Sequence, residues 1–141
     1  MSITTVGVPK ETKTAEHRVA MTPDGVREFE RAGVQVFVQA GAGEGASFHD
    51  DDYRAAGDTI VQTAADAWAQ QMVVKVKEPK EDEFGFLRRD LTLFTYLHLA
   101  ADADLTRALA ASGAACVAYE TVETAGHRLP DRKSTRLNSS H

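Results

Sequence analysis

Short apolar runs alternate along the chain with stretches whose apolar residues recur at helical spacing. This alternation predicts strands separated by helices. The predicted strands are Val6 to Val8, closed by Pro9, and residues 34–39, 59–61, 72–76, 91–97 and 114–119. The predicted helices are residues 23–32, 51–56, 63–71, 81–88 and 102–112.

The ends of two predicted helices carry local signals. Thr22 can cap the first helix, Pro23 suits its first position, and Asp24 places an acid in its first turn. Gly33 and Gly57 follow predicted helices where a glycine commonly ends one. The first helix is therefore expected to begin after Thr22 and to end before Gly33, and the second to end before Gly57.

The predicted strands lack clean polar alternation, and amphipathic helices separate them. Strands of this kind belong to a parallel sheet that is covered on both faces. We therefore predict an α/β fold, a doubly wound, Rossmann-like and mostly parallel sheet with helices on both faces. Ligands of such sheets bind outside the carboxyl ends of the strands.

Three side chains with complementary chemistry follow predicted strands. Arg18 lies in the loop after the first strand, Lys77 follows the strand at 72–76, and His98 follows the strand at 91–97. Arginine offers a planar fork to a carboxylate, lysine a compact cation, and histidine a proton carrier near neutral pH. Together they favour a small anionic substrate that exchanges a proton.

Each of these residues also has a simpler interpretation. Arg18 can be a solvated loop residue, and Lys77 a surface charge at a strand end. His98, inside an apolar segment, can be a hydrogen-bonded core histidine. The five histidines and Cys116 show no metal-ligand spacing, so no metal site is predicted.

The glycine-rich segment at 40–45 contains GxGxG but lacks the third glycine of a dinucleotide-binding turn. The dinucleotide-binding motif requires a helix directly after the turn, and no convincing helix follows this segment. A turn in which glycine permits positive φ or close packing is the better interpretation.

Composition narrows the class of protein. The net charge of -5 argues against a nucleic-acid partner. No apolar run approaches the roughly 20 residues of a membrane span, and the first residues do not resemble a signal peptide. A single cysteine, Cys116, in an apolar run suits a buried thiol in a reducing compartment. We expect a cytoplasmic protein without a membrane partner.

The last eleven residues, 131–141, are polar and read DRKSTRLNSSH. Such a segment is expected to be disordered. It also resembles the in-frame translation of a common sequencing adaptor. We therefore predict a domain at 1–130, followed by a non-native tail at 131–141.

Eight blocks of the sequence resemble the opening of the alanine dehydrogenase family. They are GVPKETK at 7–13, RVA at 18–20, TP at 22–23, QAGAGEG at 39–45, DYRAAG at 52–57, VKVKEP at 74–79, LFTYLHLAA at 93–101 and AYETV at 118–122. The resemblance extends over residues 3–130, and the blocks are specific in combination. It implies the amino-terminal, substrate-binding part of such an enzyme.

The resemblance also implies roles for the three candidate residues. Arg18 corresponds to the residue that binds the carboxylate of alanine or pyruvate. Lys77 corresponds to the lysine that contacts the substrate carboxylate and carbonyl and takes part in catalysis, and His98 to the acid–base catalyst. The implied reaction is reversible, NAD-dependent oxidative deamination of L-alanine to pyruvate and ammonia. The family binds NAD in a further domain and forms homo-oligomers, commonly hexamers.

Two other functions are compatible with the pattern. The α subunit of proton-translocating nicotinamide transhydrogenase has a similar opening, but it typically lacks the lysine and the histidine at the positions of Lys77 and His98. A non-catalytic ligand-binding module could also use this fold. Without a dinucleotide-binding domain, this segment is expected to be inactive by itself.

Overall fold

The computed structural model describes residues 3–12, 16–95, 103–118, 120–124 and 127–131, with the backbone alone from residue 118. The chain divides into two compact units, Met1–Val76 and Lys77–His141, and each is described by itself.

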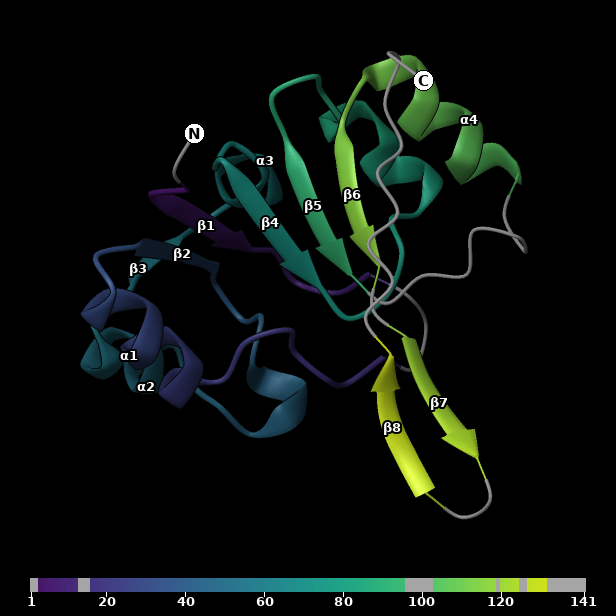
Figure 1. The fold of residues 1–141 in the computed structure, drawn as a ribbon. Helices are drawn as coiled ribbons and strands as arrows, with labels where there is room; N and C mark the ends of the chain where they lie inside the picture. Colours follow the sequence, from purple (N-terminus) through teal and green to yellow (C-terminus); the bar gives the residue numbers. More distant parts are fainter. Residues whose placement is uncertain (1–2, 13–15, 96–102, 119, 125–126, 132–141) are drawn as a thin grey trace. The chain divides into compact units, whose positions relative to one another are not determined.

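The first unit is a parallel sheet with helices (Figure 1). Its elements are β1 (Thr5–Val8), α1 (Pro23–Arg31), β2 (Gln35–Gln39), the 3-10 turn η1 (Glu44–Ala46), α2 (Asp50–Ala56), β3 (Thr59–Val61), α3 (Ala64–Trp68) and β4 (Met72–Lys75). The strand order is β3-β2-β1-β4, and Val6 pairs with Val36 on one side and with Met72 on the other. All of these pairings are parallel.

Helices cover both faces of this sheet. Gly7 faces α3, because a Cβ added there would lie 1.8 Å from the Ala67 carbonyl oxygen. Side chains alternate along a strand, so the buried Val6 and Val8 point to the opposite face. Figure 1 shows α1 and α2 on one side of the strands and α3 on the other. The predicted doubly wound α/β fold is confirmed.

Local sequence signals set the bounds of the helices in this unit. The Thr22 hydroxyl accepts a hydrogen bond from the Gly25 N–H at 3.2 Å and caps α1. Gly33 and Gly57 have φ of 86° and 108°, as expected for residues that end helices. By contrast, α3 ends at Trp68, earlier than predicted. The reason is that Gln71 is engaged with β1, where its side-chain oxygen accepts from the Thr5 N–H at 3.2 Å.

The second unit contains a further parallel strand pair. Its elements are the 3-10 helix η2 (Glu81–Phe86), β5 (Thr92–Thr95), α4 (Ala103–Ser112), β6 (Ala115–Ala118), β7 (Glu120–Thr124) and β8 (His127–Asp131). β5 and β6 are parallel, and β7 and β8 form an antiparallel hairpin. Among the described side chains of this unit, the buried leucines are Leu87, Leu91, Leu93, Leu105 and Leu109. None of the helices in the described parts of the chain has the length and apolar character of a membrane span.

The hairpin of β7 and β8 was not predicted. These strands are largely polar, and Pro130 lies within β8, so apolar periodicity gives no signal for them. Asp131, the first residue of the predicted tail, is the last residue of β8. Residues 132–141 lie outside the described residues, and their assignment as a non-native tail stays a prediction.

Candidate functional site

The strand order of the first unit reverses between β1 and β4. The chain passes from β1 outward to β2 and β3 and returns to place β4 on the other side of β1. In open α/β sheets, the crevice outside the carboxyl ends of the strands at such a reversal is the usual ligand site. The residues that follow Val8 and Lys75 are therefore the first candidates.

A buried ion pair connects these two strand ends. Lys75 Nζ lies 3.3 Å from Glu11 Oε1, and the two side chains are 1% and 3% exposed. The Val76 N–H donates to Glu11 Oε2 at 2.8 Å. The loop after β1 is thereby fixed to the end of β4. Burial of two charges requires desolvation, so stability alone is a weak explanation for this pair.

Lys77 follows the anchored Val76 directly and is half-buried. The hydrogen bond from the Val76 N–H to Glu11 holds the backbone one residue before it. Lys77 begins the second unit, whereas Arg18 lies in the first. His98 lies outside the described residues, so the gathering of these three side chains in one crevice stays a prediction.

Arg18 is held by a neighbouring carboxylate. Its Nε donates to Glu16 Oε2 and its Nη2 to Glu16 Oε1, both at 3.0 Å. The Arg18 backbone N–H also donates to Glu16 Oε2, at 2.8 Å. The Glu16 side chain is 4% exposed and that of Arg18 is 67% exposed. A buried carboxylate thus orients a solvent-facing guanidinium through a two-pronged contact.

Two contacts fix the segment on either side of Arg18. A Cβ added at Gly45 would lie 2.8 Å from the His17 carbonyl oxygen, so the turn at 41–45 packs directly on this backbone. After Arg18, the Met21 carbonyl accepts a hydrogen bond from the Tyr53 hydroxyl at 2.8 Å. Burial, and then the nearby Asp58 carboxylate, raise the pKa of Tyr53 well above its ordinary value, which keeps this hydroxyl a donor.

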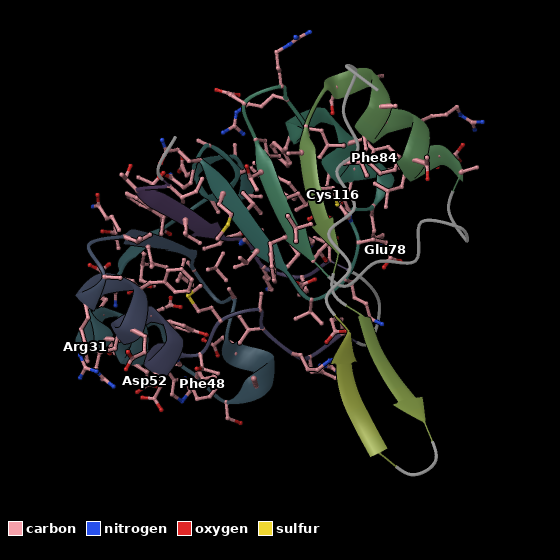
Figure 2. The ribbon with its side chains drawn as sticks, viewed as in Figure 1. Arg31, Phe48, Asp52, Glu78, Phe84 and Cys116 are labelled. Carbon is pink, nitrogen blue, oxygen red and sulfur yellow. The ribbon has the colours of Figure 1, made fainter. Side chains whose placement is uncertain are left out.

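The glycine-rich turn is used for close packing. Gly41 has φ of 81°. A Cβ added at Gly43 would lie 2.6 Å from the Tyr53 ring and 2.9 Å from the Phe48 Cβ. Phe48 lies beside this turn (Figure 2). Its ring meets the Tyr53 ring edge to face, with the centroids 6.4 Å apart. The positive φ of Gly41 and the close contacts of Gly43 confirm the interpretation of this segment as a packing turn.

A reactive cysteine and a metal site are two further kinds of candidate group. Cys116 lies buried on β6 (Figure 2), and burial raises the pKa of its thiol to about 12. It is therefore protonated at neutral pH and a poor nucleophile. In the parts of the chain that the structure describes, no three His, Cys, Asp or Glu side chains form a metal-binding group.

Sequence reasoning did not assign roles to Glu11, Lys75 or Glu16. Lys75 stands in an otherwise apolar strand, and that position is the signal that could have indicated a buried partner. The partner itself, Glu11, lies far away in the sequence, so only the strand order reveals it. Glu16 is two residues from Arg18, but spacing alone does not distinguish a buried carboxylate from a solvated one.

Comparison with known proteins shows which family this chain resembles in sequence. The family described as "Alanine dehydrogenase/PNT, N-terminal domain" matches residues 7–134. The alanine dehydrogenase of Mycolicibacterium smegmatis is 53% identical over 126 residues, which cover 89% of this chain and 34% of that relative. The alanine dehydrogenase of Bacillus subtilis is 46% identical over 125 residues, covering 89% of this chain and 33% of that relative.

Two solved structures that resemble this chain are an alanine dehydrogenase and a transhydrogenase. An L-alanine dehydrogenase superposes with a TM-score of 0.82 at 50% identity, covering 86% of this chain and 34% of that one. The transhydrogenase from Sinorhizobium meliloti gives a TM-score of 0.76 at 29% identity, covering 81% of this chain and 34% of that one. The chain thus spans about a third of the length of the proteins that it matches.

Proposed function

The chain belongs to the family of alanine dehydrogenase and PNT amino-terminal domains, and we propose that it forms the substrate-binding part of an NAD-dependent alanine dehydrogenase. The proposed reaction of the whole enzyme is reversible oxidative deamination of L-alanine to pyruvate and ammonia. We further propose that this enzyme is cytoplasmic and forms a homo-oligomer. Members of the family commonly form hexamers, so a hexamer is the proposed state. The similarity to alanine dehydrogenases at about 50% identity supports the reaction.

The observation that carries the proposal is the oriented guanidinium of Arg18. It lies in the loop after β1, is 67% exposed, and is held in a bidentate contact by Glu16. A planar guanidinium that already has a fixed orientation is suited to a small carboxylate such as that of alanine or pyruvate. Preorganisation of this kind lowers the entropy cost of substrate binding.

We assign the remaining chemistry to Lys77 and His98. Lys77 adds a second positive charge for the substrate carboxylate and carbonyl, and it follows a backbone that Glu11 anchors. His98 moves protons as water adds to the substrate imine and as ammonia departs. Arg18 and Lys77 fix the substrate, so that the reacting carbon is presented in one orientation.

The glycine-rich turn does not fit a dinucleotide. Tyr53, Phe48 and the His17 backbone pack directly against two of its glycines and leave no space beside them. No cofactor contact is therefore assigned to this chain. In the proposed enzyme, NAD is held by residues of the other two thirds of the protein.

The α subunit of a nicotinamide transhydrogenase is the second candidate, because the Sinorhizobium meliloti protein shares the fold at 29% identity. The presence of both Lys77 and His98 favours the dehydrogenase, since the transhydrogenase pattern typically lacks both. A non-catalytic ligand-binding module of the same fold is the third candidate.

A chimeric enzyme, called the joined enzyme below, tests the proposal. Residues 1–130 replace the matching segment of the M. smegmatis alanine dehydrogenase, whose other two thirds stay unchanged. We expect NAD reduction that depends on L-alanine, and NADH oxidation that depends on pyruvate and ammonium. The unmodified M. smegmatis enzyme is the control. A joined enzyme that assembles normally but transfers hydride only between nicotinamide nucleotides would favour the transhydrogenase, and one without either activity would favour the binding module.

A further inference from the structure

The proposed function leaves the glycine-rich turn at 41–45 without a role beyond packing. Gly45 is the residue of this turn that contacts the loop carrying Arg18. An added Cβ would lie 2.8 Å, 3.0 Å and 3.2 Å from the carbonyl oxygen, Cα and carbonyl carbon of His17. All three are backbone atoms, which cannot yield by a change of rotamer.

The turn is held firmly against the body of the first unit. The Gly41 N–H donates to the Asp50 carboxylate of α2 at 2.9 Å. The Gly43 carbonyl accepts from the N–H groups of Ala46 and Phe48 at 3.0 Å and 2.9 Å. A side chain at position 45 would therefore move the His17 backbone in preference to the turn.

His17 stands between the two residues that form the guanidinium contact. Glu16 precedes it and supplies both carboxylate oxygens, and Arg18 follows it and supplies Nε, Nη2 and its backbone N–H. These three hydrogen bonds, of 2.8 to 3.0 Å, require one backbone geometry between Glu16 and Arg18. A displacement of a few tenths of an ångström at His17 disturbs all three.

We propose that Gly45 is a positioning residue for Arg18. By packing against the His17 backbone, the turn at 41–45 fixes the geometry of the Glu16–Arg18 segment and so influences the affinity for the substrate carboxylate. This inference rests on the proposed role of Arg18 in binding that carboxylate. A change at Gly45 affects the binding of alanine and pyruvate, whereas the chemical step, which depends on other groups, is preserved.

The first test observes Arg18 directly in the 141-residue chain by nitrogen-15 NMR. The Arg18 Nε–H signal is assigned by its loss in Arg18→Lys. In Gly45→Ala we expect this signal to shift and to exchange faster with water, because its bond to Glu16 is disturbed. The matched control is Gly85→Ala, since an added Cβ at Gly85 has no heavy atom within 4 Å. A signal in Gly45→Ala that superposes on the wild type overturns the inference.

The second test measures kinetics in the joined enzyme. Gly45→Ala should raise KM for L-alanine and pyruvate about 10-fold, the scale of a weakened charged hydrogen bond, while kcat stays within about twofold. Gly85→Ala should change neither constant. An unchanged KM in Gly45→Ala overturns the inference even if the NMR signal moves. By contrast, a joined enzyme without alanine-dependent turnover overturns the proposed function and leaves the NMR result valid.

Glu16→Gln reaches the same guanidinium without a clash and serves if Gly45→Ala fails to fold. The amide keeps one acceptor oxygen and loses the bidentate carboxylate. We expect the same rise in KM at nearly constant kcat, and Glu16→Asp should recover part of the affinity. Equal KM values for Glu16→Gln and the wild type would show that Arg18 needs no positioning, which contradicts the inference.

Discussion

Arg18 combines two properties that usually exclude one another in a surface arginine. Its side chain is 67% exposed, yet a 4% exposed carboxylate fixes its orientation through two of its nitrogens. Solvent screens the exposed guanidinium, so the contribution of this pair to stability is modest. The arrangement is better explained by recognition, because an oriented fork meets an incoming carboxylate with little loss of side-chain entropy.

Arg18→Lys in the joined enzyme tests this geometry while it keeps the charge. A lysine cannot present two parallel N–H groups, so binding of alanine and pyruvate should weaken by about 1–3 kcal/mol. Steady-state KM values for both substrates measure the change. The matched control is Arg31→Lys on α1, whose side chain is 66% exposed and pairs with Glu28. If both substitutions leave KM unchanged, Arg18 is a solvated loop residue.

Asp58 is a buried carboxyl group that the proposed function does not use. Its residue is 8% exposed, and neither carboxyl oxygen accepts a hydrogen bond from another described residue. Burial, followed by the negative charge of Glu30, raises the pKa of Asp58 to about 7, while Arg54 opposes this shift. Asp50 adds a smaller upward contribution.

This raised pKa predicts a pH dependence of stability. Between about pH 4 and pH 7 the folded chain holds a proton on Asp58 that the unfolded chain has lost, so the free energy of unfolding should decrease as pH rises through this window. Asp58→Asn should remove that contribution to the slope. Urea unfolding of the chain at several pH values measures it, with the exposed Asp66→Asn as control. Identical slopes in Asp58→Asn and the wild type would contradict the shift.

β1 and β4 depend on one buried ion pair at their carboxyl ends. Lys75→Met leaves the Glu11 carboxylate buried without this ion pair, so it should lower the free energy of unfolding by about 3–5 kcal/mol. Glu11→Gln combined with Lys75→Met removes both charges and keeps an acceptor for the Val76 N–H. The double variant should recover most of the loss.

Urea unfolding of the chain measures this cycle. Arg31→Met provides the exposed comparison, because its pair with Glu28 has side chains 66% and 70% exposed and should contribute less than about 1 kcal/mol. A loss in Lys75→Met as small as that in Arg31→Met would mean that the pair is not buried as described.

Elements with local signals could be predicted from the sequence. Thr22 and Pro23 begin α1, and Gly57 ends α2, because caps and positive φ depend on neighbouring residues alone. The segment at 81–88 was predicted as a helix, and the structure has the shorter 3-10 helix η2 there. Acidic residues and a helical period do not distinguish these two helix types.

What the sequence could not predict depends on contacts between distant residues. The sequence identified the loop carrying Arg18 as a candidate site. It did not reveal that Gly45 packs against the His17 backbone of this loop. Likewise, the pairing of Glu11 with Lys75 follows from the return of β4 to the side of β1. Apolar periodicity predicts the elements, whereas their order in the sheet determines which polar side chains meet.

The chain covers only about a third of the alanine dehydrogenases that it matches, and its glycine-rich turn is filled by close packing. We therefore expect the purified 141-residue chain to show no NAD reduction dependent on L-alanine, because a substrate site cannot position a hydride acceptor that it does not hold. The joined enzyme, assayed at the same concentration, is the positive control. Turnover by the chain alone would require a cofactor site within it, and the glycine-rich turn would have to be reconsidered.

The kinetic effect of His98→Ala in the joined enzyme tests most directly whether this chain carries the catalytic chemistry of an alanine dehydrogenase. The remaining two thirds of that enzyme come from an alanine dehydrogenase, so a loss of turnover reports on this chain's own residue. We predict that kcat for L-alanine falls about 100-fold or more, while KM changes little, because a positioned acid–base group is lost and the substrate contacts remain. A His98→Ala enzyme with near-normal kcat would make His98 a core residue and contradict the proposed mechanism.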